Sequence, residues 1–228
     1  MNKFSKYFDH TLLKPEAGPQ DILKTVSEAV ALDTAAVCVN GCHVRSVRRF
    51  IDASGADVKV AAVAGFPLGA MSTNAKAYEV QLALEDGADE IDLVMNIGHA
   101  KAGNWAYVED EVYTIAEMCH ESGAILKLII ETCLLTDDEI VRACRSACTA
   151  GADFVKTSTG FSSGGATVHA VSLMKQALAD ADYDGHMKIK ASGGIRTLDD
   201  ARAMIEAGAD RLGCSATAAI LAEYESQE

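Results

Sequence analysis

The sequence contains no apolar stretch that approaches the roughly 18 residues of a membrane-spanning helix. Its first ten residues lack the apolar segment of a secretory signal, so we expect a cytoplasmic protein. Positive charge is scarce, because 33 acidic residues outnumber 20 lysines and arginines and give a formal net charge of −13. A field of that sign repels nucleic acids and anionic membranes, and we expect neither as a partner.

Metal-binding and dinucleotide-binding patterns are also missing. The seven cysteines form no Cys-x-x-Cys pair, so we expect reduced thiols. No Gly-x-Gly-x-x-Gly is present, which disfavours an open doubly wound sheet with a dinucleotide site. The histidines show no His-x-His or His-Glu-x-x-His spacing, and we expect structural or surface roles for His10, His43, His99, His120, His169 and His186.

The sequence does contain a repeating unit of helix-like and strand-like segments. Gly-Ala-Asp, or a close variant, begins at positions 55, 87, 123, 151 and 208, each time before an apolar run. A glycine just past an amphipathic segment is typical of a helix C-terminus, where the chain must turn back. The runs are almost continuously apolar, as in parallel strands that are buried on both faces.

Counting these runs predicts eight strands separated by helices. They are expected at Phe8–Leu13, Ala35–Val39, Val58–Ala64, Ile91–Ile97, Ile125–Glu131, Phe154–Ser158, Met187–Ala191 and Arg211–Cys214. Eight parallel strands with intervening helices predict an α/β fold, a closed (β/α)8 TIM barrel. We see no linker or change of composition, so we expect one barrel domain over residues 1–228.

Polar residues interrupt the otherwise apolar strands, and in such a barrel the chemistry lies where the carboxyl ends of the strands meet. We place at those ends Asp9, Thr11, Asn40, Asp92, Asn96, Lys127, Glu131, Thr132, Lys156, Thr157, Lys190, Ser192 and Ser215. Alternation along one strand puts Asp92 and Asn96 on the same face, which we predict to be the barrel interior.

Two lysines give the strongest functional indication. Lys156 lies near the end of the predicted strand Phe154–Ser158, and Lys190 lies near the end of the next one, Met187–Ala191. Burial and a second amine nearby both favour the uncharged form of a lysine, and an uncharged amine attacks carbonyl groups. The alternative is a structural Lys156 that forms an ion pair inside the barrel, with Asp92 as its partner.

Glycine-rich loops follow the last two predicted strands. They contain Ser192-Gly193-Gly194 and Gly213-Cys214-Ser215. In β/α barrels these loops commonly bind phosphate, because glycine lets backbone N–H groups approach an anion and a helix N-terminus adds its dipole. We expect a phosphate site there, with Ser215 capping a helix over Ala216–Tyr224.

Seven ordered motifs then give a resemblance that spans nearly the whole chain. They are Asp9–Pro15, Val37–Asn40, Ala64–Gly69, Glu90–Asn96, Ile129–Leu135, Phe154–Phe161 and Lys190–Arg196. With them the chain resembles the deoxyribose-phosphate aldolases, a family of class I aldolases. The resemblance implies reversible cleavage of 2-deoxy-D-ribose 5-phosphate to D-glyceraldehyde 3-phosphate and acetaldehyde, with no metal or organic cofactor.

The resemblance also implies roles for individual residues. Lys156 corresponds to the lysine that forms the Schiff base, Lys190 to the lysine that lowers its pKa, and Asp92 to the proton-relay carboxylate. Gly160 belongs with the two glycine-rich loops as a substrate contact. Supporting polar roles are expected for Asp9, Thr11, Lys127 and Thr159. The substrates would be small phosphorylated sugars and aldehydes, and a homodimer is an expectation from the family.

Two other functions stay open at this point. One is a phosphosugar isomerase or epimerase, which would use a carboxylate or cysteine base and form no imine. The other is a catalytically inactive protein that binds phosphosugars.

Overall fold

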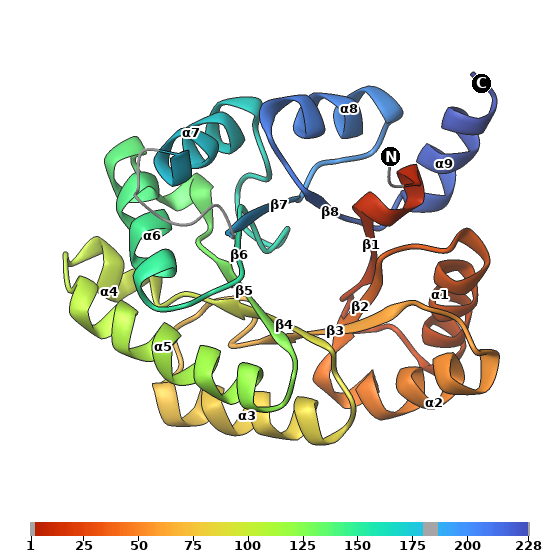
Figure 1. The fold of residues 1–228 in the computed structure, drawn as a ribbon, viewed down its shortest axis with the longest axis horizontal. Coiled ribbons are helices and arrows are strands. Elements are labelled where there is room, and N and C mark those ends of the chain that lie inside the picture. The colour runs from red at the N-terminus through yellow and green to blue at the C-terminus, as the bar shows by residue number, and fades with distance from the viewer. Residues whose placement is uncertain (1–2, 180–186, 228) are drawn as a thin grey trace.

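The computed structural model describes residues 3–179 and 187–227, so His186 lies outside the described residues. Eight strands pair in parallel and in sequence order, and β1 also pairs with β8 to close the ring (Figure 1). The expected (β/α)8 barrel is confirmed. The strands are β1 (Phe8–Leu12), β2 (Ala36–Asn40), β3 (Lys59–Ala64), β4 (Glu90–Val94), β5 (Ile125–Ile129), β6 (Phe154–Lys156), β7 (Lys188–Ser192) and β8 (Arg211–Cys214).

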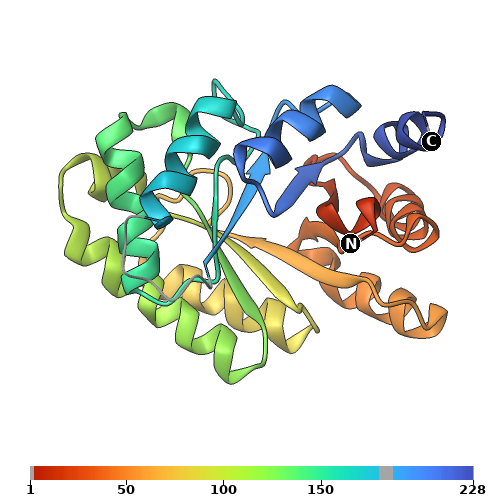
Figure 2. The same ribbon diagram turned by 45° about the horizontal axis from the view of Figure 1, so that its top comes forward.

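Helices surround the ring of strands on the outside (Figure 1). They are η1 (Phe4–Tyr7), α1 (Pro19–Leu32), η2 (Gly41–His43), α2 (Val44–Ser54), α3 (Thr73–Glu85), α4 (Ile97–Lys101), α5 (Trp105–Glu121), η3 (Thr132–Leu134), α6 (Asp137–Thr149), α7 (Val168–Ala179), α8 (Leu198–Ala207) and α9 (Thr217–Glu225). The first and last elements lie side by side (Figure 2), where the rings of Phe4 and Tyr224 stack with centroids 4.4 Å apart.

The Gly-Ala-Asp repeat has a structural explanation at both of its ends. Its glycine ends a helix in the left-handed conformation, as at Gly208 with φ 116° after α8. Its aspartate accepts a hydrogen bond from the backbone N–H of the preceding strand. Asp89 binds Val60 N at 2.7 Å, Asp153 binds Leu126 N at 2.8 Å, and Asp210 binds Ile189 N at 2.9 Å. In these three copies the repeat therefore ends a helix and fastens the next strand to its neighbour.

Several predicted boundaries were wrong: most differ by one residue, and the strand expected over Phe154–Ser158 ends two residues early, at Lys156. Three of the differences have a local reason. The strand expected over Ile91–Ile97 ends at Val94, because Asn96 accepts a hydrogen bond from His99 N at 3.2 Å and caps α4. The strand expected to reach Glu131 ends at Ile129, and Glu131 itself is left-handed with φ 53°. Helix α9 starts at Thr217 with Ala216 in the capping position, so Ser215 is not its cap.

The apolar core lies between the strands and the helices, while the barrel interior has two unlike sides. On β2 and β3 the buried interior residues are small and apolar, as at Ala36, Cys38, Ala61 and Val63. The other strands bury charged side chains: Asp9, Glu90, Asp92, Lys127, Lys156 and Lys190 are all at most 4% exposed. Within the described ranges no helix is long and apolar enough to cross a membrane.

One buried ion pair lies outside the barrel interior, between α3 and α5. Lys76 Nζ is 2.7 Å from Glu111 Oε1 and donates to Val94 O at 2.8 Å, and both side chains are fully buried. Removing one member leaves an uncompensated charge in the core. We expect Lys76→Met to lower the free energy of unfolding by about 3–5 kcal/mol, measured by urea denaturation.

The matched control for this prediction is Lys101→Met. Lys101 Nζ is 2.8 Å from Glu139 Oε2, but the lysine side chain is 45% exposed. We expect a change below about 1 kcal/mol, since water screens exposed pairs. Equal effects of the two substitutions would contradict the assigned role of burial.

Candidate active site

Lys156, Lys190 and Asp92 meet inside the barrel. Strands β6 and β7 are neighbours, and their register pairs Lys156 with Lys190. Lys156 Nζ is 2.6 Å from Asp92 Oδ2, and Lys190 Nζ is 2.7 Å from the same oxygen. All three residues are at most 2% exposed. The structure thus brings the three predicted residues together, including the contact between Lys156 and Asp92 that the structural alternative required.

A glycine on β8 makes room for the Lys190 side chain. A Cβ atom on Gly213 would lie 3.1 Å from Lys190 Cε and 2.9 Å from Ser192 Cβ. Contacts that short require Ser192 to shift and Lys190 Cε to give way by a few tenths of an ångström, so we expect a larger residue to disturb the contact of the amine with Asp92. Gly213 was predicted as a phosphate contact, and in the structure its missing side chain also leaves room for Lys190.

Four more charged residues extend the cluster toward the amino ends of the strands. Lys190 binds Asp9, and Arg211 Nη1 is 2.6 Å from the other oxygen of Asp9. Lys127 Nζ binds Glu90 and lies 3.0 Å from Asp92 Oδ1 and 3.6 Å from Asp9 Oδ2. We call Asp9, Glu90, Asp92, Lys127, Lys156, Lys190 and Arg211 the ionic network.

The placement of Asp9, Asp92 and Lys127 corrects the prediction that they stand at the carboxyl ends of strands. Asp92 is the middle residue of β4 and pairs in register with Lys127. Asp9 pairs in register with Ala36, the first residue of β2, and Lys127 is the middle residue of β5. Both lie deeper in the barrel than Lys156, which ends β6. The apolar context of these residues indicated burial but not depth.

The two lysines differ in their proton affinity. Burial lowers the pKa of Lys156, Asp92 opposes that shift, and the Lys190 cation adds to it, so the pKa lies below its usual value. Burial also acts against the Lys190 cation, but Asp9 and Asp92 outweigh it and raise the Lys190 pKa. Burial would raise the pKa of Asp92, yet Lys127, Lys156 and Lys190 hold it well below its usual range. Lys156 is therefore the amine that gives up its proton more easily.

Lys156 opens into a cavity of about 410 Å³ at the carboxyl ends of the strands. Of the buried cations that the structure describes in the barrel, it alone lines this cavity. Predicted residues that line it with Lys156 are Thr11, Thr159, Gly160, Ser192, Gly193, Gly194, Gly213 and Ser215. Lys14, Phe161 and Arg196 also line it. Sequence reasoning missed these three, because strand patterns say nothing about where loop side chains point.

The loop after β7 is shaped by two consecutive left-handed glycines, Gly193 with φ 82° and Gly194 with φ 84°. A side chain on Gly193 would also come within 3.0 Å of Gly165 Cα in the loop after β6. The Ser192 hydroxyl donates to Ser158 O at 2.6 Å and so joins the same two loops. At these two glycines no side chain covers the backbone, and the loop also contributes Ser192, Ile195 and Arg196 to the cavity lining.

Glu131 was predicted to lie at the end of a strand, but no individual role was assigned to it from the sequence. It is 1% exposed, and it accepts hydrogen bonds from both the backbone N–H and the hydroxyl of Thr159. These bonds hold the loop that carries Gly160 over the end of β6. The signal was an acidic residue at the end of an apolar run, but its partner depends on a loop folding back.

Comparison with known proteins places the chain in a family. The sequence model of the DeoC/LacD family aldolases matches residues 4–223. The chain belongs to this aldolase family. It is 51% identical over 211 residues to a deoxyribose-phosphate aldolase of Thermococcus gammatolerans, covering 92% of each chain. It is 52% identical over 219 residues to that of Streptococcus gordonii, covering 96% of each.

Solved structures agree with this assignment. A putative deoxyribose-phosphate aldolase from Coccidioides immitis superimposes with a TM-score of 0.92 at 38% identity, covering 97% of this chain and 85% of that one. A deoxyribose phosphate aldolase from Aeropyrum pernix, described as a tetramer, superimposes with a TM-score of 0.89 at 32% identity, covering 98% and 92%. The aldolase described here thus shares both the fold and much of the sequence of these proteins.

The contact between Gly213 and Lys190 gives a prediction for the aldolase. Gly213→Ala should displace the Lys190 amine and lower kcat about 10- to 100-fold, since small misplacements of reacting groups are costly. The measurement is aldol-cleavage turnover with folding checked by circular dichroism. The control is Gly41→Ala, because a Cβ atom there meets nothing within 4 Å. Full activity of Gly213→Ala would show that the close approach has no consequence.

Proposed function

We propose that this aldolase cleaves 2-deoxy-D-ribose 5-phosphate reversibly to D-glyceraldehyde 3-phosphate and acetaldehyde through an imine on Lys156. The observation that carries the proposal is the state of Lys156: it is buried, its pKa is lowered, and it lines the cavity. The names of relatives that are about 50% identical over more than 90% of the chain support the substrate. An isomerase would leave this amine without a use.

In the proposed reaction, uncharged Lys156 adds to the C1 aldehyde of the open-chain sugar, and the adduct loses water to give an iminium ion. The Asp92 carboxylate, beside the charged Lys190 amine, then accepts the proton of the C3 hydroxyl. The C3–O bond becomes a carbonyl as the C2–C3 bond breaks and glyceraldehyde 3-phosphate leaves. The C2–C3 electron pair forms the C1=C2 bond of the enamine, and the π pair of the C=N bond moves to the nitrogen. Protonation of the enamine at C2 and addition of water release acetaldehyde and restore the amine.

Asp92 and Lys190 suit this proton transfer because they are hydrogen-bonded to each other and lie next to the Lys156 amine. Asp92 Oδ2 lies within hydrogen-bond distance of both amines, so a proton has a short path between Lys156 and Lys190. Lys190 stays charged through its contact with Asp9, and that charge favours the uncharged form of Lys156. We propose nucleophile, pKa-lowering and relay roles for Lys156, Lys190 and Asp92 on this basis.

The phosphate group of the substrate would bind at the other side of the cavity. Gly160, Ser192, Gly193, Gly194, Gly213 and Ser215 line that side and offer backbone N–H groups. Lys14 and Arg196 add positive charge to a cavity in a chain with a net charge of −13. Thr11 and Thr159 also line the cavity and are proposed as supporting polar groups. Asp9 and Lys127 would support the site from within the ionic network.

We further propose one catalytic domain over residues 1–228 that acts in the cytoplasm without a metal or organic cofactor. The reaction as written needs only side-chain amines and carboxylates. We also propose that the chain self-associates, because the Aeropyrum pernix relative is described as a tetramer, and a homodimer is the assembly expected from the family. Light scattering on the purified chain tests that assembly.

The imine gives the first test of this function. Borohydride added with acetaldehyde should leave a stable ethyl adduct on Lys156, located by peptide mass spectrometry. Lys156→Ala should form no adduct there and lose at least about 10⁴-fold in kcat. Lys24→Ala is the control, since Lys24 is an exposed lysine of α1 with 77% of its side chain accessible. Unchanged turnover in Lys156→Ala would refute the imine.

The phosphate site gives the second test. Arg196→Ala and Lys14→Ala should each lower kcat/KM for deoxyribose 5-phosphate about 10- to 100-fold, as expected for losing one charge-assisted contact. Turnover of unphosphorylated deoxyribose provides the control and should change little. If both substrates lose activity equally, the two cations do not bind the phosphate.

A further inference from the structure

Arg211 closes the ionic network at the end of the barrel opposite to the substrate cavity. It is the first residue of β8, and its Nη1 atom lies 2.6 Å from Asp9 Oδ1 and 3.5 Å from Glu90 Oε1. Its side chain is only 17% exposed. It does not line the substrate cavity, and neither the sequence analysis nor the proposed reaction gives it a role.

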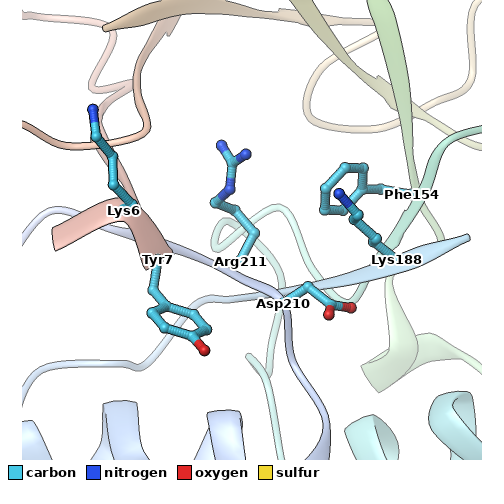
Figure 3. A pocket seen from close by; sticks show the side chains of 6 residues that line it. All are labelled: Lys6, Tyr7, Phe154, Lys188, Asp210 and Arg211. Atoms are coloured by element: carbon cyan, nitrogen blue, oxygen red, sulfur yellow. The ribbon is translucent and has the colours of Figure 1, made fainter. Parts of the chain in front are cut away.

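The outer side of Arg211 faces a separate cavity of about 270 Å³ (Figure 3). Lys6, Tyr7, Phe154, Lys188 and Asp210 also line it. Lys6 is engaged elsewhere, because its amine binds Asp33 at 2.7 Å and two backbone carbonyls. The exposed Lys188 amine lies 5.7 Å from the Phe154 ring centre. Arg211 is thus the cation of this cavity that reaches the network carboxylates.

The charges of the network balance only when Lys156 is uncharged. The network contains three carboxylates, Asp9, Glu90 and Asp92, and three cations besides Lys156, namely Lys127, Lys190 and Arg211. A protonated Lys156 would be a fourth cation against three anions. An unbalanced charge in the interior of a protein is costly, because little water is present to solvate it.

We propose that Arg211 is a positioning residue for the imine chemistry, which from the far end of the barrel supplies the third positive charge that keeps the Lys156 amine uncharged. The inference rests on the proposed function, in which that amine is the nucleophile. Arg211 does not touch the reacting atoms and acts through Asp9, Glu90 and the network between them.

The groups that surround both ends of the network decide where a proton would go if Arg211 were lost. Lys156 faces Asp92 on β4, Lys190 on β7 and Cys38 on β2, whose pKa burial raises to about 11. Arg211 faces Asp9 on β1, Glu90 on β4 and the Phe154 ring on β6, 5.8 Å away. An uncharged amine is a far stronger base than a carboxylate or a thiol. Lys156 would therefore take up the proton that restores the balance.

Loss of the Arg211 charge should move the pH dependence of activity in one direction. Imine formation requires the uncharged amine, so activity is lost as the pH falls through the pKa of Lys156. Arg211→Met should move that acid limb of kcat/KM to higher pH by about one unit or more, with about tenfold lower activity on the limb and recovery at alkaline pH. Arg211→Lys keeps the charge and should retain the wild-type limb.

A charge-compensating variant separates this effect from a structural one. Arg211→Met combined with Glu90→Gln removes one cation and one carboxylate, so its acid limb should return toward the wild-type position. The rate of borohydride trapping of acetaldehyde on Lys156, measured against pH, should shift in parallel. Circular dichroism checks the fold of each variant. If Arg211→Met alone does not fold, the double variant is compared with Glu90→Gln alone. The acid limb of the double variant must then lie at higher pH than that of Glu90→Gln.

Two outcomes would overturn the inference. One is an acid limb that stays at the wild-type pH in Arg211→Met, and the other is a double variant that stays as shifted as the single one. Wild-type protein that forms no adduct on Lys156 would instead refute the proposed function itself. An adduct in the wild type with an unshifted Arg211→Met limb would refute only the role of Arg211.

Discussion

The structure depends on one carboxylate oxygen that accepts hydrogen bonds from two lysine amines. Asp92 Oδ2 lies 2.6 Å from Lys156 Nζ and 2.7 Å from Lys190 Nζ. One negative charge balances only one ammonium ion, so a second contact must decide which amine keeps its proton. That contact is Asp9, which binds Lys190, and it leaves Lys156 as the amine that loses its proton. The register of β6 and β7 places Lys156 beside Lys190, and the missing side chain at Gly213 leaves room for the Lys190 side chain.

The charged interior is better explained by chemistry than by stability. Buried ion pairs often contribute little net stability, because removing charges from water costs about as much as their attraction returns. The small residues on β2 and β3, such as Ala61 and Val63, show that the same barrel also fills part of its interior with apolar side chains. The remaining strands carry seven charged residues whose contacts lead toward one cavity. Such a network can hold the Lys156 amine at the cavity in one protonation state.

The sequence predicted what depends on local pattern and chain order. Glycine caps and apolar runs are local, and consecutive strands of a β/α barrel are neighbours, so the approach of Lys156 and Lys190 followed from the fold. The contact of Lys190 with Asp9, 181 residues away, exists because β1 pairs with β8 to close the ring. The place of Arg196 at the cavity and the contact of Glu131 with Thr159 were not predicted, because both depend on loop geometry. The expected cap at Ser215 was wrong because α9 begins two residues after it.

The scale of the electrostatics explains how an acidic protein can hold an uncharged lysine. A net charge of −13 would by itself raise the pKa of every lysine. Salt screens exposed charges beyond about 8–10 Å, so the acidic surface acts weakly on the barrel interior. Inside the barrel the screening is slight, and the few charges in contact with Lys156 dominate. The state of the nucleophile is therefore set by the balance of a small buried network, and its dependence on the surface charge is minor.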